Sequence, residues 1–194
     1  MKIAAVELFE VEIPPIPPIA QYFPKIYDII LCRFSTDQGL QGWGEYQGKR
    51  EIPVLKENLD WYRLLREKTH IPMALHLGAP AGVLQALKAE CVDYVNLGGS
   101  ALQVRKAAAL AEAAQVPCWV QMGGLCLGVL AAYSVHLQST LPNATLPCDE
   151  LPFTRVADVL EGGLKLEAGH FHVPQGSGLG IKVDMKVVEK YRVA

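Results

Sequence analysis

Along the first fifty residues, apolar and polar positions alternate in the manner that predicts short strands. Residues 2–13 alternate, residues 26–35 are β-branched and apolar, and residues 40–46 return as a third strand after a turn at 36–39. The proline-dense stretch at 14–24 is expected to be a stiff, extended loop. The pattern therefore predicts a small antiparallel sheet at the N-terminus.

From residue 51 the pattern changes to short apolar strands that alternate with segments of helical period. The expected strands are 51–55, 71–76, 92–97, 117–121 and 144–148. The expected helices are 58–68, 80–89, 100–114 and 127–141. This alternation is typical of βα units in a parallel sheet. A complete eightfold barrel takes about 250 residues, so only four to five strands of a TIM-like half-barrel fit here.

The last thirty residues leave this rhythm. Residues 163–167 and 170–173 predict a hairpin, and residues 186–191 predict a terminal helical turn. Because β-rich segments flank the βα array, the two chain ends are expected to pack together as a capping region. We expect a cap segment, a partial barrel and a segment that returns to the cap, at residues 1–48, 49–160 and 161–194.

Composition and charge limit the classes of molecule that this chain is expected to bind. With 51% apolar and 20% charged residues, the 194-residue chain is expected to be globular. A net charge of −2 gives no electrostatic basis for binding nucleic acid or an anionic membrane. The five cysteines contain no C-x-x-C pair, and Glu7 and Glu10 interrupt any apolar leader, so we expect reduced thiols in a cytoplasmic protein.

One uncharged stretch needs a separate explanation. Residues 118–137 contain no Asp, Glu, Lys or Arg and match the length of a bilayer span. However, Gly123 and Gly124 interrupt the stretch, and Gln121 and His136 lie within it. A buried strand, a turn and a buried helix are therefore favoured over a membrane span.

Several motifs resemble those of one enzyme family. The hairpin TDQGLQGWGE is similar to the glycine-tryptophan-glycine-glutamate signature in the cap of the enolase superfamily, in its mandelate racemase and muconate lactonizing branch. The tail GGLKLEAGHFHVPQGSGLGIKVD resembles the closing segment of that branch. The segments EIPV, HIPMALHL and DYVNLGGSALQVRKAAALAEAAQVP resemble its fourth, fifth and sixth barrel strands, the last with its following helix. The resemblance implies a cap over a modified barrel.

The same resemblance implies chemistry that this sequence retains only in part. Family members stabilise an enediolate with magnesium, which prefers hard oxygen ligands, and remove a proton with a lysine or histidine base. Glu51 matches the ligand of the fourth strand, whereas the first three barrel strands, with a base and a ligand, have no counterpart after GWGEY. His76 stands where the fifth strand carries acidic residues, Asn96 stands near the expected base, and Gln121 ends the seventh strand. Glu150 follows the eighth strand.

Each candidate residue has a structural alternative. Glu51 could flank a helix, and His76 could bond to a loop carbonyl instead of facing a pocket. Gly98 and Gly99 before Ser100 could hold an anion, but Ser100 as a helix N-cap is favoured. His170 and His172 share a strand face, and we expect surface residues because no third metal ligand is near in sequence.

Two functions remain open. The first is a shortened relative without magnesium-dependent proton abstraction, an oligomer that binds a small organic acid or nothing specific. The alternative is a divergent racemase, cycloisomerase or dehydratase whose site is rebuilt across a homodimer, with His76 and Glu150 as catalytic candidates, Asn96 and Gln121 as substrate-binding candidates and Glu51 as an incomplete metal site. The residues themselves indicate no cofactor, and only the resemblance implies magnesium. Because a half-barrel leaves strand edges unpaired, we expect two copies to join.

Overall fold

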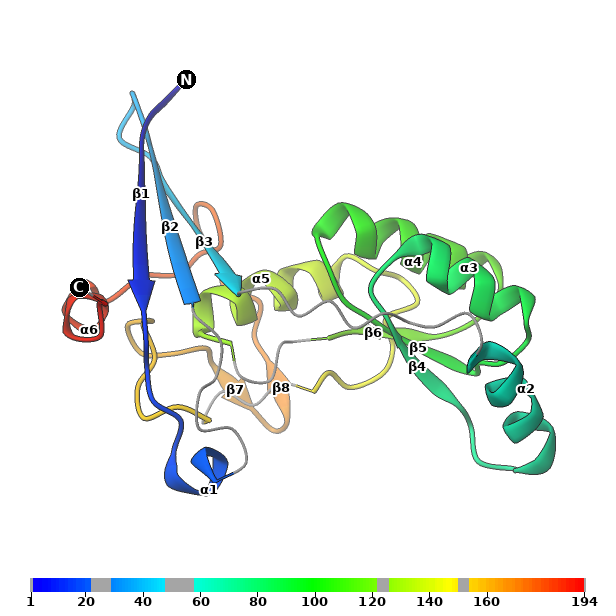
Figure 1. Ribbon diagram of the computed structural model, residues 1–194. Helices are drawn as coiled ribbons and strands as arrows, with labels where there is room; N and C mark the ends of the chain where they lie inside the picture. Colours follow the sequence, from blue (N-terminus) through cyan, green and yellow to red (C-terminus); the bar gives the residue numbers. More distant parts are fainter. Residues whose placement is uncertain (1, 22–28, 48–57, 122–125, 150–153, 194) are drawn as a thin grey trace. The chain divides into compact units, whose positions relative to one another are not determined.

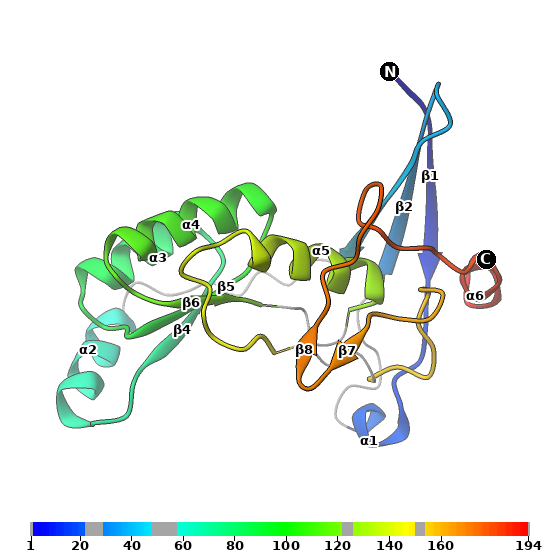
Figure 2. The same ribbon diagram turned by 180° about the vertical axis from the view of Figure 1, so that it is seen from behind.

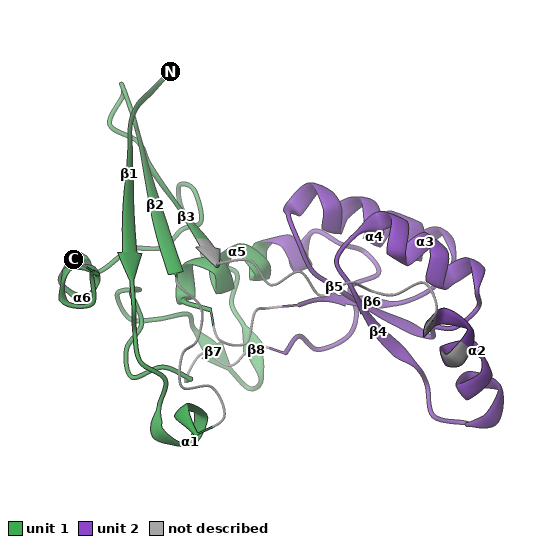
Figure 3. Cartoon of the chain, viewed as in Figure 1, with its two compact units in different colours: residues 1–50, 123–136, 150–194 green, residues 51–122, 137–149 purple. Residues whose placement is uncertain are grey.

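The computed structural model describes residues 2–21, 29–47, 58–121, 126–149 and 154–193. The chain divides into two compact units (Figure 3). Unit 1 comprises residues 1–50, 123–136 and 150–194, and unit 2 comprises residues 51–122 and 137–149. Unit 1 contains the antiparallel sheets and unit 2 the parallel βα array, so the protein belongs to the α/β class.

Unit 1 is built on a three-stranded antiparallel sheet (Figure 1). Its strands are β1 (Ile3–Val11), β2 (Ile29–Thr36) and β3 (Gln41–Gln47), in that spatial order. Alternation along the strands buries one face, where Phe9, Val11 and Leu31 form a core together with residues after position 126. The expected N-terminal sheet is confirmed.

The two ends of the chain meet at β1. Val11 forms an antiparallel bridge with Arg192, and the Glu12 N–H donates to the Tyr191 carbonyl at 3.0 Å. Tyr191 follows α6 (Met185–Lys190), whose buried Val188 packs into the same core. The C-terminal segment therefore returns to the N-terminal sheet.

The hairpin near the C-terminus is also confirmed. Its strands are β7 (Leu166–Glu167) and β8 (His170–Phe171). The two residues between them, Ala168 and Gly169, have φ of 49° and 80°. Positive φ at both central positions suits the right-handed twist of a tight hairpin.

The proline-rich segment differs from expectation. Residues 17–20 form a helical turn, α1 (Pro17–Ala20), where the sequence predicted an extended loop. Proline fixes φ near the helical value and has no N–H to satisfy, so it is well suited to the first helical position. The Ile19 and Ala20 N–H groups both donate to the Ile16 carbonyl. Prolines at the start of the segment thus initiate a turn of helix.

Unit 2 contains a parallel sheet with the order β4-β5-β6. Its strands are β4 (Ala74–Leu77), β5 (Tyr94–Leu97) and β6 (Cys118–Val120). Its helices include α2 (Asn58–Lys68), α3 (Pro80–Lys88) and α4 (Ala101–Ala113). Figures 1 and 2 show α3 and α4 covering one face of this sheet, where Leu77, Leu97 and Val120 are buried. The helix α5 (Gly128–Ser139) follows, and the boundary between the units falls within it.

The described residues contain three parallel strands, fewer than the predicted four to five. The expected strand at 51–55 lies outside the described residues, and the expected strand at 144–148 does not form. That segment nevertheless follows β6, because the Cys118 N–H donates to the Asn143 carbonyl at 2.9 Å. Further along, the side chain of Gln138 bridges β6 and this segment. The Val120 N–H donates to Gln138 Oε1 at 2.9 Å, and Gln138 Nε2 donates to the Leu146 carbonyl at 3.2 Å. An amide side chain thus replaces a strand-to-strand bond.

Replacing Gln138 with leucine is expected to lower the free energy of unfolding of unit 2 by about 2 kcal/mol, because two backbone groups beside β6 lose their partner. Urea unfolding followed by circular dichroism measures the loss. Gln85→Leu on the exposed face of α3 is the matched control and should change little. Equal stability of the two variants would contradict the bridging role.

Among the described residues, no helix is long and apolar enough to cross a membrane. The stretch 118–137 instead contains β6 and the first part of α5, with residues 122–125 outside the described part. All five cysteines are described, and none forms a disulfide. Burial raises the pKa of the Cys118 thiol to about 11, which keeps this thiol protonated at neutral pH.

Candidate functional site

The candidate site lies on the face of the parallel sheet opposite α3 and α4. Parallel register places His76 beside Asn96, and Asn96 beside Trp119 on β6. Gln121 follows two residues later, so alternation directs it to the same face. His76 is exposed, whereas Asn96 is 5% exposed. The structure therefore brings together three sequence-predicted candidates, His76, Asn96 and Gln121, at the carboxyl ends of three strands.

A hydrogen bond between neighbouring strands defines the chemistry of His76. Its Nδ1 lies 2.5 Å from Asn96 Oδ1. An amide oxygen only accepts, so His76 donates from Nδ1–H, and in the neutral imidazole Nε2 is left as an acceptor. Among the described residues, no bond from His76 to a loop carbonyl is observed, which was the expected alternative. Asn96 therefore orients the imidazole and selects its tautomer.

The loop after β5 fits closely around the imidazole. A Cβ atom at Gly98 would lie 2.9 Å from His76 Cε1, 3.4 Å from its Nε2 and 3.9 Å from Gln121 Cβ. Any side chain at residue 98 would therefore displace the His76 ring. The same distances show that His76 and Gln121 are neighbours across this glycine.

This arrangement does not fit a magnesium ion. His76 supplies a nitrogen and Asn96 an amide oxygen that is already bonded, whereas magnesium prefers carboxylate and water oxygens. Within the described ranges, no three His, Cys, Asp or Glu side chains gather in a way that could hold a metal. Glu51 and Glu150, the acidic candidates from sequence, lie outside the described residues.

Two of the structural alternatives are confirmed. Ser100 is the N-cap of α4 in a capping box, in which its Oγ accepts from the Gln103 N–H and Gln103 Oε1 accepts from the Ser100 N–H. His170 and His172 are both exposed, and His172 Nε2 lies 3.0 Å from Glu167 Oε2 in the hairpin. These residues serve local structure.

A cavity of about 660 Å³ lies in unit 2 around the loop before β4 and the loop before β5. These loops lie at the amino ends of the strands, away from His76. Two of its cations are already paired: Arg66 Nη2 lies 2.6 Å from Asp93 Oδ1, and Arg63 Nη1 lies 3.3 Å from Glu67 Oε1. We therefore place the candidate site at the carboxyl ends.

Sequence reasoning missed a polar cluster in unit 1 at the start of α5. Glu45 accepts from the Leu127 N–H at 2.9 Å and the Leu130 N–H at 3.0 Å, and Asp158 accepts from the Gly128 N–H at 2.9 Å. Two carboxylates thus satisfy three N–H groups that have no partner within the helix. Glu45 is the glutamate of the GWGE signature. Its two hydrogen bonds to backbone N–H groups show that it caps the start of α5.

Comparison with known proteins identifies the family. The sequence model of the family described as "Enolase C-terminal domain-like" matches residues 50–187. The chain therefore belongs to the enolase superfamily, in its mandelate racemase and muconate lactonizing branch.

Curated relatives cover several reaction types within this family. A D-galactonate dehydratase family member of Paenibacillus sp. is 30% identical over 140 residues, which cover 69% of this chain and 34% of the relative. The N-succinylamino acid racemase of Thermus thermophilus is 38% identical over 102 residues, 51% of this chain and 27% of the relative. The chloromuconate cycloisomerase of Cupriavidus necator is 28% identical over 174 residues, which cover 78% of this chain and 46% of the relative. The chain thus spans less than half the length of these relatives.

Solved structures show the same fold. The N-succinyl Arg/Lys racemase of Bacillus cereus superposes with a TM-score of 0.82 at 13% identity, with 100% of this chain and 99% of that chain covered. The muconate lactonizing enzyme of Pseudomonas putida superposes with a TM-score of 0.64 at 12% identity, with both chains covered completely. At such identities the likeness concerns the fold alone.

Proposed function

We propose that this protein is a shortened relative of the racemases, cycloisomerases and dehydratases of its family, and that it binds a small organic acid without magnesium-dependent proton abstraction. The observation that carries the proposal is the hydrogen bond between His76 and Asn96. It places an imidazole where the family resemblance calls for acidic ligands, and an amide near the position of the expected base. The amide N–H groups can donate to a carboxylate, whereas an imidazole and an amide do not hold magnesium firmly.

The available donors support an anionic ligand. Within the described part of the chain, the side-chain N–H groups of Asn96 and Gln121 have no hydrogen-bond partner and can donate to a carboxylate. His76 lies beside them, with its Nε2 next to Gly98. Trp119 and Tyr94 lie on the same sheet face and offer apolar surface for the carbon skeleton of the acid.

Calorimetric titration with small carboxylic acids, including N-acylated amino acids and sugar acids, tests the proposal. We expect binding in the presence of EDTA, and we expect His76→Ala to weaken it at least tenfold because the oriented imidazole is lost. His170→Ala, which removes an exposed histidine from the hairpin, should leave the affinity unchanged. Equal affinity of the His76 variant and the wild type would refute the site.

The alternative, an enzyme with a rebuilt site, gives the opposite result. Such an enzyme would contain stoichiometric metal after purification and would exchange the carbon-bound proton of a carboxylic acid for solvent deuterium. Metal analysis and proton NMR in deuterated buffer measure both. Metal together with exchange would overturn our preference. The alternative also requires a homodimer, in which the parallel sheets of two copies complete one another.

A further inference from the structure

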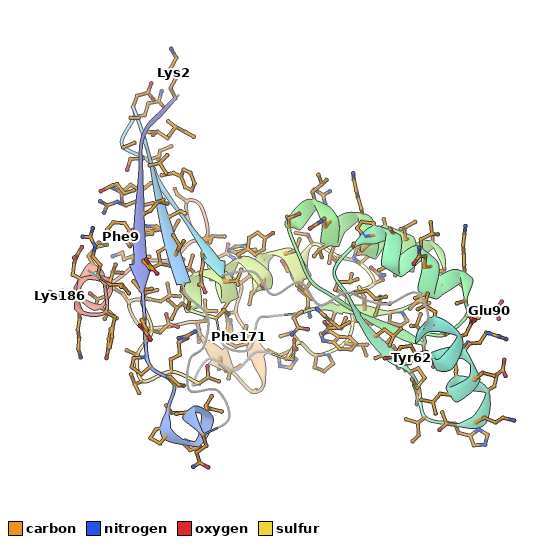
Figure 4. All side chains as sticks on the ribbon, in the orientation of Figure 1. Lys2, Phe9, Tyr62, Glu90, Phe171 and Lys186 are labelled. Atoms are coloured by element: carbon orange, nitrogen blue, oxygen red, sulfur yellow. The ribbon has the colours of Figure 1, made fainter. Side chains whose placement is uncertain are left out.

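The three-stranded sheet of unit 1 carries an exposed apolar face. The buried face of β1–β3 includes Phe9, labelled in Figure 4, whereas the opposite face presents large side chains to solvent. These side chains and their exposed fractions are Ile3 (65%), Val6 (54%), Leu8 (60%), Phe34 (38%) and Leu40 (49%). Single exposed apolar residues are normal on a protein, but a contiguous set marks a contact surface.

A β-bulge places Ile3 on this face. Ile3 is opposite Thr36 whereas Ala5 is opposite Ser35, so β1 carries one extra residue at this point. Without the bulge, alternation would turn Ile3 away from Val6 and Leu8, but the extra residue brings all three to one side. Leu40 alternates with the β3 residues of the same face. Four of the five side chains therefore line β1 and the adjoining turn, and Phe34 lies on β2.

Two glycines of β3 lie beside these side chains on the same face. In the strand register, Gly42 is opposite Phe34 and Gly44 is opposite Cys32. A Cβ added at Gly42 or Gly44 would meet no atom within 4 Å, so even Phe34 does not cover this part of β3. The face thus combines an apolar ridge on β1 and β2 with an open floor on β3. We call the ridge and floor together the outer sheet face.

We propose that the outer sheet face binds the same face of a second copy of this chain, so that the two sheets pack as a sandwich about a twofold axis. A twofold contact needs a surface that complements itself, and large side chains beside glycines with open space above them meet this condition, because the side chains of each copy can pack over the glycines of the other. Phe34 of each copy would lie over Gly42 and Gly44 of the other.

The size of the face agrees with a reversible dimer. Five large apolar side chains, exposed by 38–65%, offer roughly 500 Å² on each copy, or about 1,000 Å² in total, which is where specific interfaces begin. An interface of this size dissociates at accessible protein concentrations. The contact lies wholly within unit 1, and it is independent of ligand binding at His76 and of any contact between parallel sheets in unit 2.

Sedimentation velocity of the full chain over roughly 1 to 100 µM, the range expected for a contact of this size, tests the proposal. We expect a concentration-dependent dimer whose dissociation constant rises at least 30-fold in Phe34→Lys, because each copy would place a cation in an apolar contact with the other. Gly42→Val tests the open floor on β3 separately and should raise the dissociation constant at least tenfold. Because valine favours strands and a Cβ at this position meets no atom within 4 Å, we expect this variant to keep the monomer fold.

Two control variants separate this contact from others. Leu102→Lys replaces a leucine on α4 that is 64% exposed and should leave the dimer unchanged. Ala74→Lys alters the exposed face of the parallel sheet, and dimer loss in this variant alone would overturn the proposal in favour of joined half-barrels. A monomer at every concentration would also overturn it, as would a monomer that sediments with phosphatidylserine vesicles unless Phe34 is replaced.

Cys32 provides a second measurement, because it lies on the outer sheet face opposite Gly44. Maleimide labelling of Cys32 should slow at least fivefold between the lowest and highest protein concentrations, since the partner would cover it. Cys148, which lies in unit 2, is the internal reference and should label at a constant rate. A constant rate at Cys32 while a dimer forms would place the interface elsewhere.

Discussion

Replacing Glu45 with alanine is expected to lower the free energy of unfolding of unit 1 by about 3 kcal/mol, because the Leu127 and Leu130 N–H groups lose their carboxylate acceptor. The carboxylate also carries negative charge at the positive end of α5, where the helix dipole favours it. Hydrogen exchange locates the loss. The Leu127 and Leu130 amides should exchange faster, while amides of α4 in unit 2 should keep their protection.

The size of this effect distinguishes capping from simple loss of charge. Glu10→Ala removes an exposed carboxylate from the same sheet and should change the stability by less than about 0.5 kcal/mol. Glu45→Gln keeps one acceptor oxygen and should cost about half as much as Glu45→Ala. A Glu45→Ala protein as stable as the Glu10→Ala control would show that the signature glutamate has another role.

Local patterns in the sequence predicted most of the secondary structure. The helical period gave residues 58–68 as a helix, and α2 has those bounds. Apolar runs of strand length located β4, β5 and β6 to within three residues at either end. These elements follow from side chains close in sequence, which is why one chain suffices to find them.

The sequence predictions were wrong where the local structure depends on residues distant in sequence or on the exact backbone geometry. The strand expected at 144–148 fails to form where the side chain of Gln138 takes the hydrogen bonds that a ladder would use. The β-bulge before Ala5 moves the Ile3 side chain to the opposite face of the sheet. Alternation counted from the sequence alone does not predict this change of face. Neither feature leaves a local sequence signal.

The candidate site shows the same division. The family resemblance identified His76, Asn96 and Gln121 as separate candidates, but only the parallel register pairs His76 with Asn96. The GWGE signature, recognised by resemblance, contains Glu45, yet the partners of this glutamate lie more than eighty residues further along the chain. Contacts of that range depend on the complete fold, so the motif was recognised while the role of its glutamate was missed.

Arg155 places a positive charge near the two carboxylates at the start of α5, Glu45 and Asp158. It is 8% exposed, and its Nη1 donates to the Ile13 carbonyl at 2.6 Å. Burial lowers its pKa, while the charges of Glu45 and Asp158 favour its protonated form. Burial also raises the pKa of Asp158, against hydrogen bonds from the backbone and the charge of Arg155, which lower it. The cluster is therefore one cation between two acidic groups in a largely desolvated region.

Arg155→Met is expected to be the most destabilising of these substitutions, at about 3–5 kcal/mol at pH 7, because two carboxylates lose their counter-charge. The loss should depend on pH. Without Arg155 the pKa of Asp158 rises further above its ordinary value of 3.8, so the folded state binds a proton that the unfolded state releases. Stability from such a group is present at low pH and is lost as pH rises through the folded pKa.

The cost of Arg155→Met should therefore be larger at pH 8 than at pH 5, as measured by urea unfolding at both values. Arg192→Met, an exposed arginine beside the same sheet, is the control and should show a small cost at either pH. The double variant Arg155→Met, Glu45→Gln loses the cation and one carboxylate charge together. Its loss of stability should therefore be smaller than the sum of the losses of the two single variants. Additive costs, or a loss independent of pH, would mean that Arg155 acts through packing and its bond to Ile13 alone.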